Sequence, residues 1–164
     1  MRSHTRGKPI GASRVEMTEI VLPEDTNQYG HVWGGRVMTL IDKAAAIAAV
    51  RHSRTNVVTA SVDSLIFRAP VKLGHILRLL SSVNATFHSS MEVGVKVISE
   101  DPLSGRQAQC CSAYVTMVAL DAGGRPTPVP RLVPAGREDR RRQLEAARRR
   151  RARLQQRDRK ERRS

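Results

Sequence analysis

The stretch that decides the fold of this chain is Asn27-Gln-Tyr-Gly-His-Val-Trp-Gly-Gly-Arg-Val-Met-Thr-Leu-Ile-Asp42. It is a polar, glycine-broken loop that leads directly into an apolar helix. Gly34 and Gly35 stand where this helix is expected to begin, and bare N–H groups at a helix start bind an anion or oxyanion without any side chain. Asn27 adds an amide before the glycines, and Asp42 adds a carboxylate on the helix. This combination suits the hydrolysis of an acyl bond.

Beyond the glycines, apolar residues recur at helical spacing from Gly34 to about Arg51. Five alanines lie between positions 44 and 49. Their small side chains allow whatever packs on this helix to approach its backbone closely. A curved sheet wrapped around the helix fits this composition.

Strand-like segments surround the helix in the sequence. Alternation of apolar and polar residues, with short turns between segments, predicts strands over 15–22, 57–67, 75–87, 91–97 and 106–120. One strand, one long helix and four further strands indicate the α+β class, with an antiparallel sheet wrapped around one central helix.

The two ends of the chain differ from this middle part. Residues 1–13 contain little to bury and are expected to be flexible, which leaves 14–134 as the folded domain. Residues 137–164 hold fourteen Lys and Arg against five Asp and Glu, so this tail carries nine of the fourteen net positive charges. Its composition favours a helix, but Leu144 and Leu154 are its only large aliphatic residues. A basic tail over 135–164 without a face to bury is therefore expected.

The cysteines and the absence of long apolar runs indicate the cellular location. Cys110 and Cys111 are adjacent in a predicted strand and point to opposite faces, so a disulfide between them is not expected. Free thiols suit a reducing compartment. No apolar run is long enough to span a bilayer, and no signal-type segment follows the basic N-terminus. These features predict a cytoplasmic protein.

Several stretches together resemble the acyl-CoA thioesterase family of the hotdog fold. The matching stretches are Leu22-Pro-Glu-Asp-Thr-Asn-Gln-Tyr-Gly, Trp33-Gly-Gly-Arg-Val-Met-Thr-Leu-Ile-Asp-Lys-Ala-Ala, Thr59-Ala-Ser-Val-Asp-Ser-Leu-Ile-Phe, Pro70-Val-Lys-Leu-Gly-His, Ser89-Ser-Met-Glu-Val and Tyr114-Val-Thr-Met-Val-Ala-Leu-Asp. The resemblance implies hydrolysis of acyl-CoA to a free acid and CoA, by dimers that join two sheets edge to edge and often form trimers of dimers. It implies that Asn27 and Asp42 are the catalytic pair. The arginine-rich tail is not part of the pattern, and His75 departs from it.

The candidate contacts with the CoA and acyl parts of the substrate are Gly34, Ser61, Phe67, Arg68, Ser89, Ser90 and Met91. The resemblance implies that the Ser89–Met91 segment lies near the pantetheine and nucleotide of CoA, and the charge of Arg68 suits the CoA phosphates. The Ser89–Met91 segment is equally typical of an ordinary hairpin, and Arg68 of a solvated surface. No metal or redox cofactor is expected, because the five histidines show no ligand-type spacing with carboxylates or cysteines.

Helix geometry separates the two halves of the predicted catalytic site. Gly35 and Asp42 are seven residues apart, so they lie on nearly the same helix face but about 10 Å apart along its axis. A carbonyl bound at the Gly35 amide is then out of reach of Asp42 in the same chain. A site that combines Asn27 and its loop with Asp42 of a dimer partner resolves this distance, and the family resemblance implies such sharing.

Two other functions compete with thioester hydrolysis. One is a binding or scaffold protein on the same core, whose basic tail contacts nucleic acid or another polyanion. The other is a hotdog hydratase acting on enoyl-CoA, although His31 is not placed as its catalytic histidine would be. Whether Asp42 acts as a nucleophile or as a general base stays open at this point.

Overall fold

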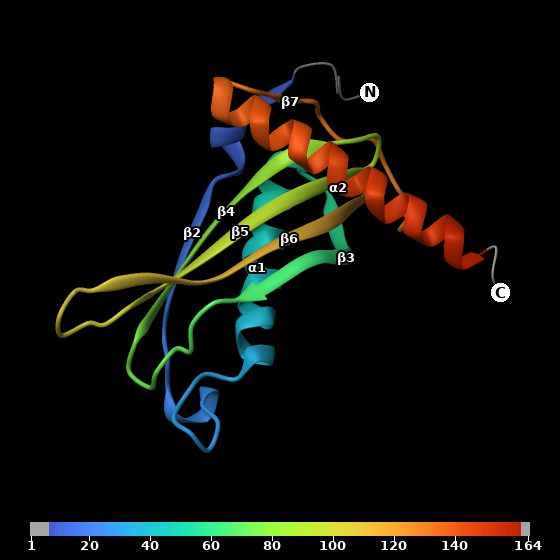
Figure 1. The fold of residues 1–164 in the computed structure, drawn as a ribbon. Coiled ribbons are helices and arrows are strands. Elements are labelled where there is room, and N and C mark those ends of the chain that lie inside the picture. Colours follow the sequence, from blue (N-terminus) through green and yellow to red (C-terminus); the bar gives the residue numbers. More distant parts are fainter. Residues whose placement is uncertain (1–6, 162–164) are drawn as a thin grey trace.

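Helix α1 (Gly34–Ser53) forms the centre of the structure, a computed structural model that describes residues 7–161 (Figure 1). It begins at the residue that the sequence predicted, and it ends at Arg54, whose backbone is left-handed with φ of 57°. One side of the helix is buried, at Val37, Leu40, Ile41, Ala44, Ala45, Ala48 and Ala49. The alanine run therefore lies against the sheet, as its small volume allows.

Five antiparallel strands form the main sheet, in the order β2-β4-β5-β6-β3. They are β2 (Val15–Ile20), β3 (Asn56–Phe67), β4 (Ile76–Thr86), β5 (Ser90–Glu100) and β6 (Gln107–Leu120). Both β2 and β3 are edge strands, because each pairs with one neighbour only in the sheet described. A second, two-stranded parallel sheet joins β1 (Lys8–Pro9) to β7 (Leu132–Val133). Short 3-10 turns, η1 (Ile10–Ser13) and η2 (Pro23–Asp25), flank β2.

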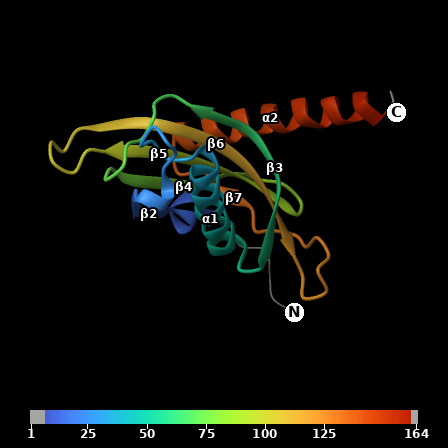
Figure 2. The ribbon, with the colours of Figure 1, turned by 90° about the horizontal axis from the view of Figure 1, so that it is seen from below.

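The two faces of the main sheet have different partners. Met91, Val93, Val95 and Val97 alternate along β5 and are buried on the face that packs against α1. Figures 1 and 2 show the sheet curved around α1, with a second helix, α2 (Arg137–Glu161), crossing its opposite face. The predicted α+β class, with an antiparallel sheet wrapped around one long helix, is confirmed. The face toward α1 is called the inner face below, and the face toward α2 the outer face.

The N-terminal segment buries more side chains than the sequence predicted. The side chains of Ile10 and Ser13 are buried, with 3% and 0% of their surface exposed. The Ser13 hydroxyl donates to the Ile10 carbonyl over 2.9 Å and accepts from the Val83 N–H over 3.0 Å, which ties η1 to β4. The expectation that this segment has little to bury is wrong for residues 7–13, where two side chains are buried, and its flexibility stays a prediction. Residues 1–6 lie outside the described part of the chain.

The basic tail also differs from its prediction. It forms helix α2, as its composition favours, but the expectation that it has no face to bury is wrong. Ala146 is fully buried against the sheet, and the guanidinium of Arg149 lies 3.6 Å from the centre of the Tyr114 ring. Residues 162–164 lie outside the described chain. None of the helices over residues 7–161 combines the length and apolarity needed to cross a bilayer.

Candidate active site

Asn27 organises the loop that precedes α1. Its side-chain oxygen accepts the backbone N–H of Tyr29 over 3.0 Å and that of His31 over 3.2 Å. Its backbone N–H donates to the His31 carbonyl over 2.8 Å. The oxygen of Asn27 therefore serves the turn itself, as asparagine oxygens commonly do. Its amide NH₂ makes no hydrogen bond within residues 7–161, so this donor is open to a substrate or a water molecule.

Gly34 and Gly35 open helix α1 with unused backbone donors. Trp33 occupies the N-cap position without a side-chain capping bond, and the first N–H groups that bond back to it are those of Arg36 and Val37. Within the described chain, the amides of Gly34 and Gly35 donate to no other group. A Cβ atom added at Gly35 would meet nothing within 4 Å. The helix start thus presents two N–H groups that are not used within the described chain, with open space beside Gly35, and the helix dipole favours negative charge there.

Asp42 lies exposed on α1, two turns beyond Gly35, and faces strand β3. Its carboxylate accepts a hydrogen bond from the Thr59 hydroxyl over 2.5 Å. The same hydroxyl lies 3.4 Å from the Met117 sulfur, at the edge of the buried core. Within residues 7–161, the Asp42 side chain has no hydrogen bond to Asn27 or Gly35. One chain therefore holds two separate groups: the Asn27 loop with the glycines, and Asp42 with Thr59.

Three of the predicted substrate contacts lie on or near the inner face. A Cβ atom added at Gly34 would lie 3.5 Å from the Phe67 ring, so these two residues are neighbours. Phe67 is 51% exposed. Met91 is fully buried and pairs with Met117 across the β5–β6 ladder. The strand alternation that buries Met91 thus removes it from the surface of the single chain, where a substrate contact was expected.

The remaining predicted contacts lie on the outer face or at its rim. Ser61 and Ser90 line one small hollow of about 280 Å³, together with Arg150, Arg153 and Leu154 of helix α2. The Ser89 backbone carbonyl accepts the Ala119 N–H over 2.9 Å in the adjoining turn. The structure therefore brings Ser61 and Ser90 together. It also places arginines of α2 beside them, which the sequence did not predict.

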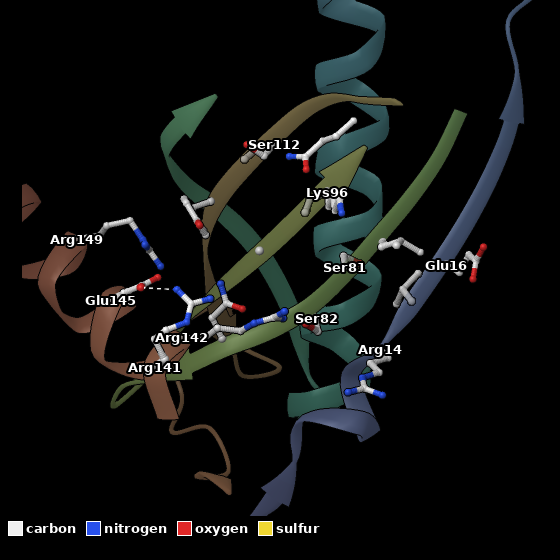
Figure 3. A pocket seen from close by; sticks show the side chains of 18 of the residues that line it. Arg14, Glu16, Ser81, Ser82, Lys96, Ser112, Arg141, Arg142, Glu145 and Arg149 are labelled. Atoms are coloured by element: carbon white, nitrogen blue, oxygen red, sulfur yellow. Dashed lines mark hydrogen bonds and ion pairs between the residues drawn. The ribbon is translucent and has the colours of Figure 1, made fainter. Parts of the chain in front are cut away.

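Arg68 lines a larger open hollow of about 880 Å³ between helix α2 and strand β2 (Figure 3). Its floor is the outer face of the sheet, and its wall on one side carries Arg141, Arg142, Glu145 and Arg149 of α2. Arg141 is paired there with Glu138 and Glu145. This hollow is separate from Asp42 and Thr59, which lie at the inner face.

Thr59 is the residue that the sequence did not single out. Threonine is common in strands, and nothing in its spacing links it to Asp42, 17 residues earlier. Its neighbours Ala60 and Ser61 interrupt the regular apolar alternation. That interruption is the feature of the sequence that could have indicated irregular strand pairing at Thr59. Among residues 7–161, no group of three His, Cys, Asp or Glu side chains is placed to hold a metal ion.

Comparison with known proteins identifies close relatives. The family model described as the thioesterase superfamily matches residues 29–105. An uncharacterized acyl-CoA thioester hydrolase, YkhA of Bacillus subtilis, is 43% identical over 127 residues, covering 77% of this chain and 74% of that protein. The cytosolic acyl coenzyme A thioester hydrolase of Rattus norvegicus is 35% identical over 136 residues. The match covers 81% of this chain and about a third (35%) of the rat protein.

Solved structures agree with this relationship. A hexameric acyl-CoA thioesterase, solved in its apo form, is 38% identical with a TM-score of 0.89, over 92% of this chain and 97% of its own. The acyl-CoA hydrolase of Staphylococcus aureus, in complex with butyryl-CoA, CoA and CoA disulfide, is 34% identical with a TM-score of 0.87, over 94% of each chain. Variants of that enzyme with an aspartate, an asparagine or a threonine replaced by alanine match with TM-scores of 0.88, 0.90 and 0.87.

The coverage also bears on the C-terminal helix. Residues 137–164 are 28 of the 164 residues. Two of the S. aureus variants cover 96% of this chain, so the structural match extends well into this segment. The expectation that the tail stands apart from the family is therefore not supported for its backbone.

Proposed function

We infer that this chain, which belongs to the hotdog-fold acyl-CoA thioester hydrolases of the thioesterase superfamily, completes its active site only when two subunits meet. The reaction is hydrolysis of an acyl-CoA thioester to a carboxylic acid and CoA. The observation that supports the shared site is the separation, within one chain, of the Asn27 loop from Asp42. Gly35 and Asp42 are two helical turns, or about 10 Å, apart along the α1 axis.

A partner subunit also has a surface to bind. Strand β3 is an edge strand of the sheet, and an uncovered apolar edge promotes pairing with another chain. Large hydrophobic side chains are exposed along β3, at Val58, Val62, Ile66 and Phe67, and others are exposed on α1, at Met38, Ile47 and Val50. Two of the similar solved structures are described as hexameric. We propose a homodimer through this edge, and a trimer of such dimers.

The chemistry follows from the groups that the two subunits contribute. The amide N–H of Gly35 binds the thioester carbonyl oxygen and stabilises the charge that develops on it. The Asn27 NH₂ group orients the substrate or the attacking water. Asp42 of the partner acts on the carbonyl carbon, as general base for that water or as the nucleophile itself. In either case the C–S bond breaks, the acyl carbon gains a hydroxyl, and the CoA sulfur takes a proton.

Thr59 belongs to this machinery because its hydroxyl donates to the Asp42 carboxylate. Such a bond fixes the carboxylate and leaves its second oxygen directed at the reaction. The three residue types replaced in the S. aureus variants, aspartate, asparagine and threonine, are those of Asp42, Asn27 and Thr59. We propose Gly34 and Phe67 as contacts near the reacting group, and Ser61, Arg68, Ser89 and Ser90 as contacts for CoA.

A substrate panel tests the activity. Wild type and Asp42→Asn are compared on acyl-CoA substrates from acetyl to palmitoyl, with release of free CoA thiol as the signal. We expect the substitution to lower kcat by about a hundredfold or more, because it removes the group that acts on the carbonyl. Equal rates for both proteins on every substrate would refute the assignment of Asp42.

Mixed dimers test the sharing. An Asn27→Ala chain and an Asp42→Ala chain carry different affinity tags, and doubly tagged dimers are purified. One of the two sites in such a dimer regains both groups, so we expect up to about half of the wild-type activity per dimer, while each variant alone is inactive. Doubly tagged dimers with no more activity than the parents would show that the two residues act within one chain.

A further inference from the structure

Strand β3 is irregular at the point where it meets the active site. Thr59 pairs with Met117, but the next pair along the ladder is Ser61 with Thr116. A second shift separates the pair Val62 and Val115 from the pair Ser64 and Tyr114. Ala60 and Asp63 are therefore extra residues in β3, with no counterpart in β6. Each such bulge reverses the face to which the following side chains point.

The first bulge decides where Thr59 points. Thr59 lies opposite Met117 on the inner face and reaches Asp42, whereas Ser61 lies opposite Thr116 and lines a hollow on the outer face. In a regular strand, residues 59 and 61 would share one face. A shift of this register by one residue would turn the Thr59 hydroxyl away from Asp42.

A cluster on the outer face holds this irregular segment. Asp63, the extra residue of the second bulge, accepts hydrogen bonds from the Arg153 guanidinium and, over 3.4 Å, from the Thr116 hydroxyl. Arg153 also donates to the Thr116 hydroxyl over 2.9 Å. Ser61 donates to the other Asp63 oxygen over 3.3 Å. One side chain of helix α2 thereby joins β3 to β6 across both bulges.

This link matters because β3 is an edge strand. Its ladder with β6 is the single ladder that fixes its register within the described chain, and that ladder is interrupted twice. The Asp63 side chain is only 10% exposed, so its ion pair with Arg153 is sheltered from water and little screened by salt. Helix α2, which carries Arg153, lies over the face of the sheet opposite α1 (Figure 1).

We propose that Arg153 is a positioning residue for thioester hydrolysis, which through Asp63 and Thr116 fixes the bulged segment of β3 so that Thr59 points at Asp42. The inference rests on the proposed function, because it assumes that the bond between Thr59 and Asp42 serves catalysis. It assigns the docked arginine-rich helix a role in the reaction, in which Arg153 acts on Asp42 through Asp63, Thr116 and Thr59 and not through a hydrogen bond of its own.

A double-mutant cycle tests the link between Arg153 and Thr59. The proteins are wild type, Arg153→Met, Thr59→Val and the double variant, with kcat and KM measured on one acyl-CoA substrate. Arg151→Met is the matched control, because Arg151 is an exposed arginine two positions away on the same helix. Asp63→Asn replaces Arg153→Met if that protein fails to fold. Urea unfolding of each variant separates activity from stability.

We expect Arg153→Met to lower kcat about tenfold with KM changed less than about twofold, because a displacement of 1 Å at a catalytic group costs that much or more. With Val at position 59, the hydroxyl to be positioned is absent, so the same change should lower kcat less than about twofold. The difference is a fivefold to tenfold coupling, or about 1.0–1.4 kcal/mol.

Equal losses of kcat in both backgrounds would overturn the proposal, because Arg153 would then act independently of Thr59. So would an equal loss in Arg151→Met, an unchanged kcat in Arg153→Met, or full activity in Thr59→Val. Failure of the proposed function gives a different result: Asp42→Asn would keep its activity, whatever the cycle shows.

Discussion

The docking of helix α2 through Arg149 gives a quantitative prediction. Glu92 is only 2% exposed, on the outer face of β5, and its carboxylate accepts two hydrogen bonds from the Arg149 guanidinium, of 3.0 and 2.7 Å. The Arg149→Met substitution keeps a long apolar stem on the helix but removes the charge. Glu92 is then left buried with one remaining partner, the Asn84 amide at 3.2 Å.

The expected loss of stability follows from these contacts. Removing one partner of a buried ion pair costs about 3–5 kcal/mol, because a charge stays buried without compensation. The Arg149 side chain is 23% exposed and the Asn84 bond persists, so the lower part of this range applies. Helix α2 can also lift locally and let water reach Glu92, which limits the cost to that of undocking the helix. We expect a fall of about 2–3 kcal/mol in the free energy of unfolding.

Urea unfolding at one protein concentration measures this change, since an oligomer's stability depends on concentration. Glu92→Gln, Arg149→Met and the double variant complete a cycle, and the double variant should lie within about 1 kcal/mol of wild type, because no charge is left buried. Limited trypsin digestion reports on undocking, since α2 is rich in arginine. Arg149→Met within about 0.5 kcal/mol of wild type, with unchanged cleavage in α2, would refute the docking by this pair.

Three further predictions concern groups away from the active site. Burial lowers the pKa of His52, whose Nε2 bonds the Pro130 carbonyl at 2.9 Å, so the unfolded chain binds the proton more readily. The stability that neutral, buried His52 contributes is complete above pH about 6.5. It is lost as the pH falls, by at most about 1.4 kcal/mol per pH unit. In urea unfolding, the stability of His52→Gln should therefore depend less on acid pH than that of wild type. Burial raises the pKa of Cys110 to about 11 and also raises that of Cys111, so Ellman's reagent should titrate both thiols rapidly only after unfolding. Arg54→Gly should stabilise the protein to urea by about 0.5–1 kcal/mol, because glycine adopts the left-handed conformation at the end of α1 without strain.

The regular parts of the fold could be predicted because their sequence periods are simple. The apolar spacing from Val37 to Ala49 has the period of a helix, and the alternation from Met91 to Val97 has the period of a strand. Their helix and strands lie where the sequence placed them. In the site, Asn27, Gly35 and Asp42 could be selected because they cluster in one stretch of chain, and their catalytic roles remain predictions.

Other features of the site depend on contacts that periodicity does not express. A bulge adds a single residue to one strand, so Ala60 and Asp63 change the face to which neighbouring side chains of β3 point. The residue types of β3 remain typical of a strand, so its composition does not indicate the bulges. The hydrogen bond between Thr59 and Asp42 depends on the face to which Thr59 points. Simple alternation of apolar and polar residues does not predict that face when a bulge is present. The burial of Ile10 in the core and the hydrogen bond of Ser13 to β4 likewise involve residues that are distant in the sequence.

Helix α2 shows how a helix can dock with scarcely any apolar stripe. Ala146, Arg149 and Arg153 are three and four residues apart, so they fall on one face of the helix. On the sheet, Glu92 and Asp63 are the acids that meet this face, paired with Arg149 and Arg153 respectively. Alanine allows close approach, and each arginine packs its long stem while its guanidinium reaches a carboxylate. In a sequence, such docking is therefore indicated by arginines at helical spacing in the helix together with acidic residues in the strands. Part of the excess of arginine over acid in α2 is thus balanced by carboxylates in the sheet.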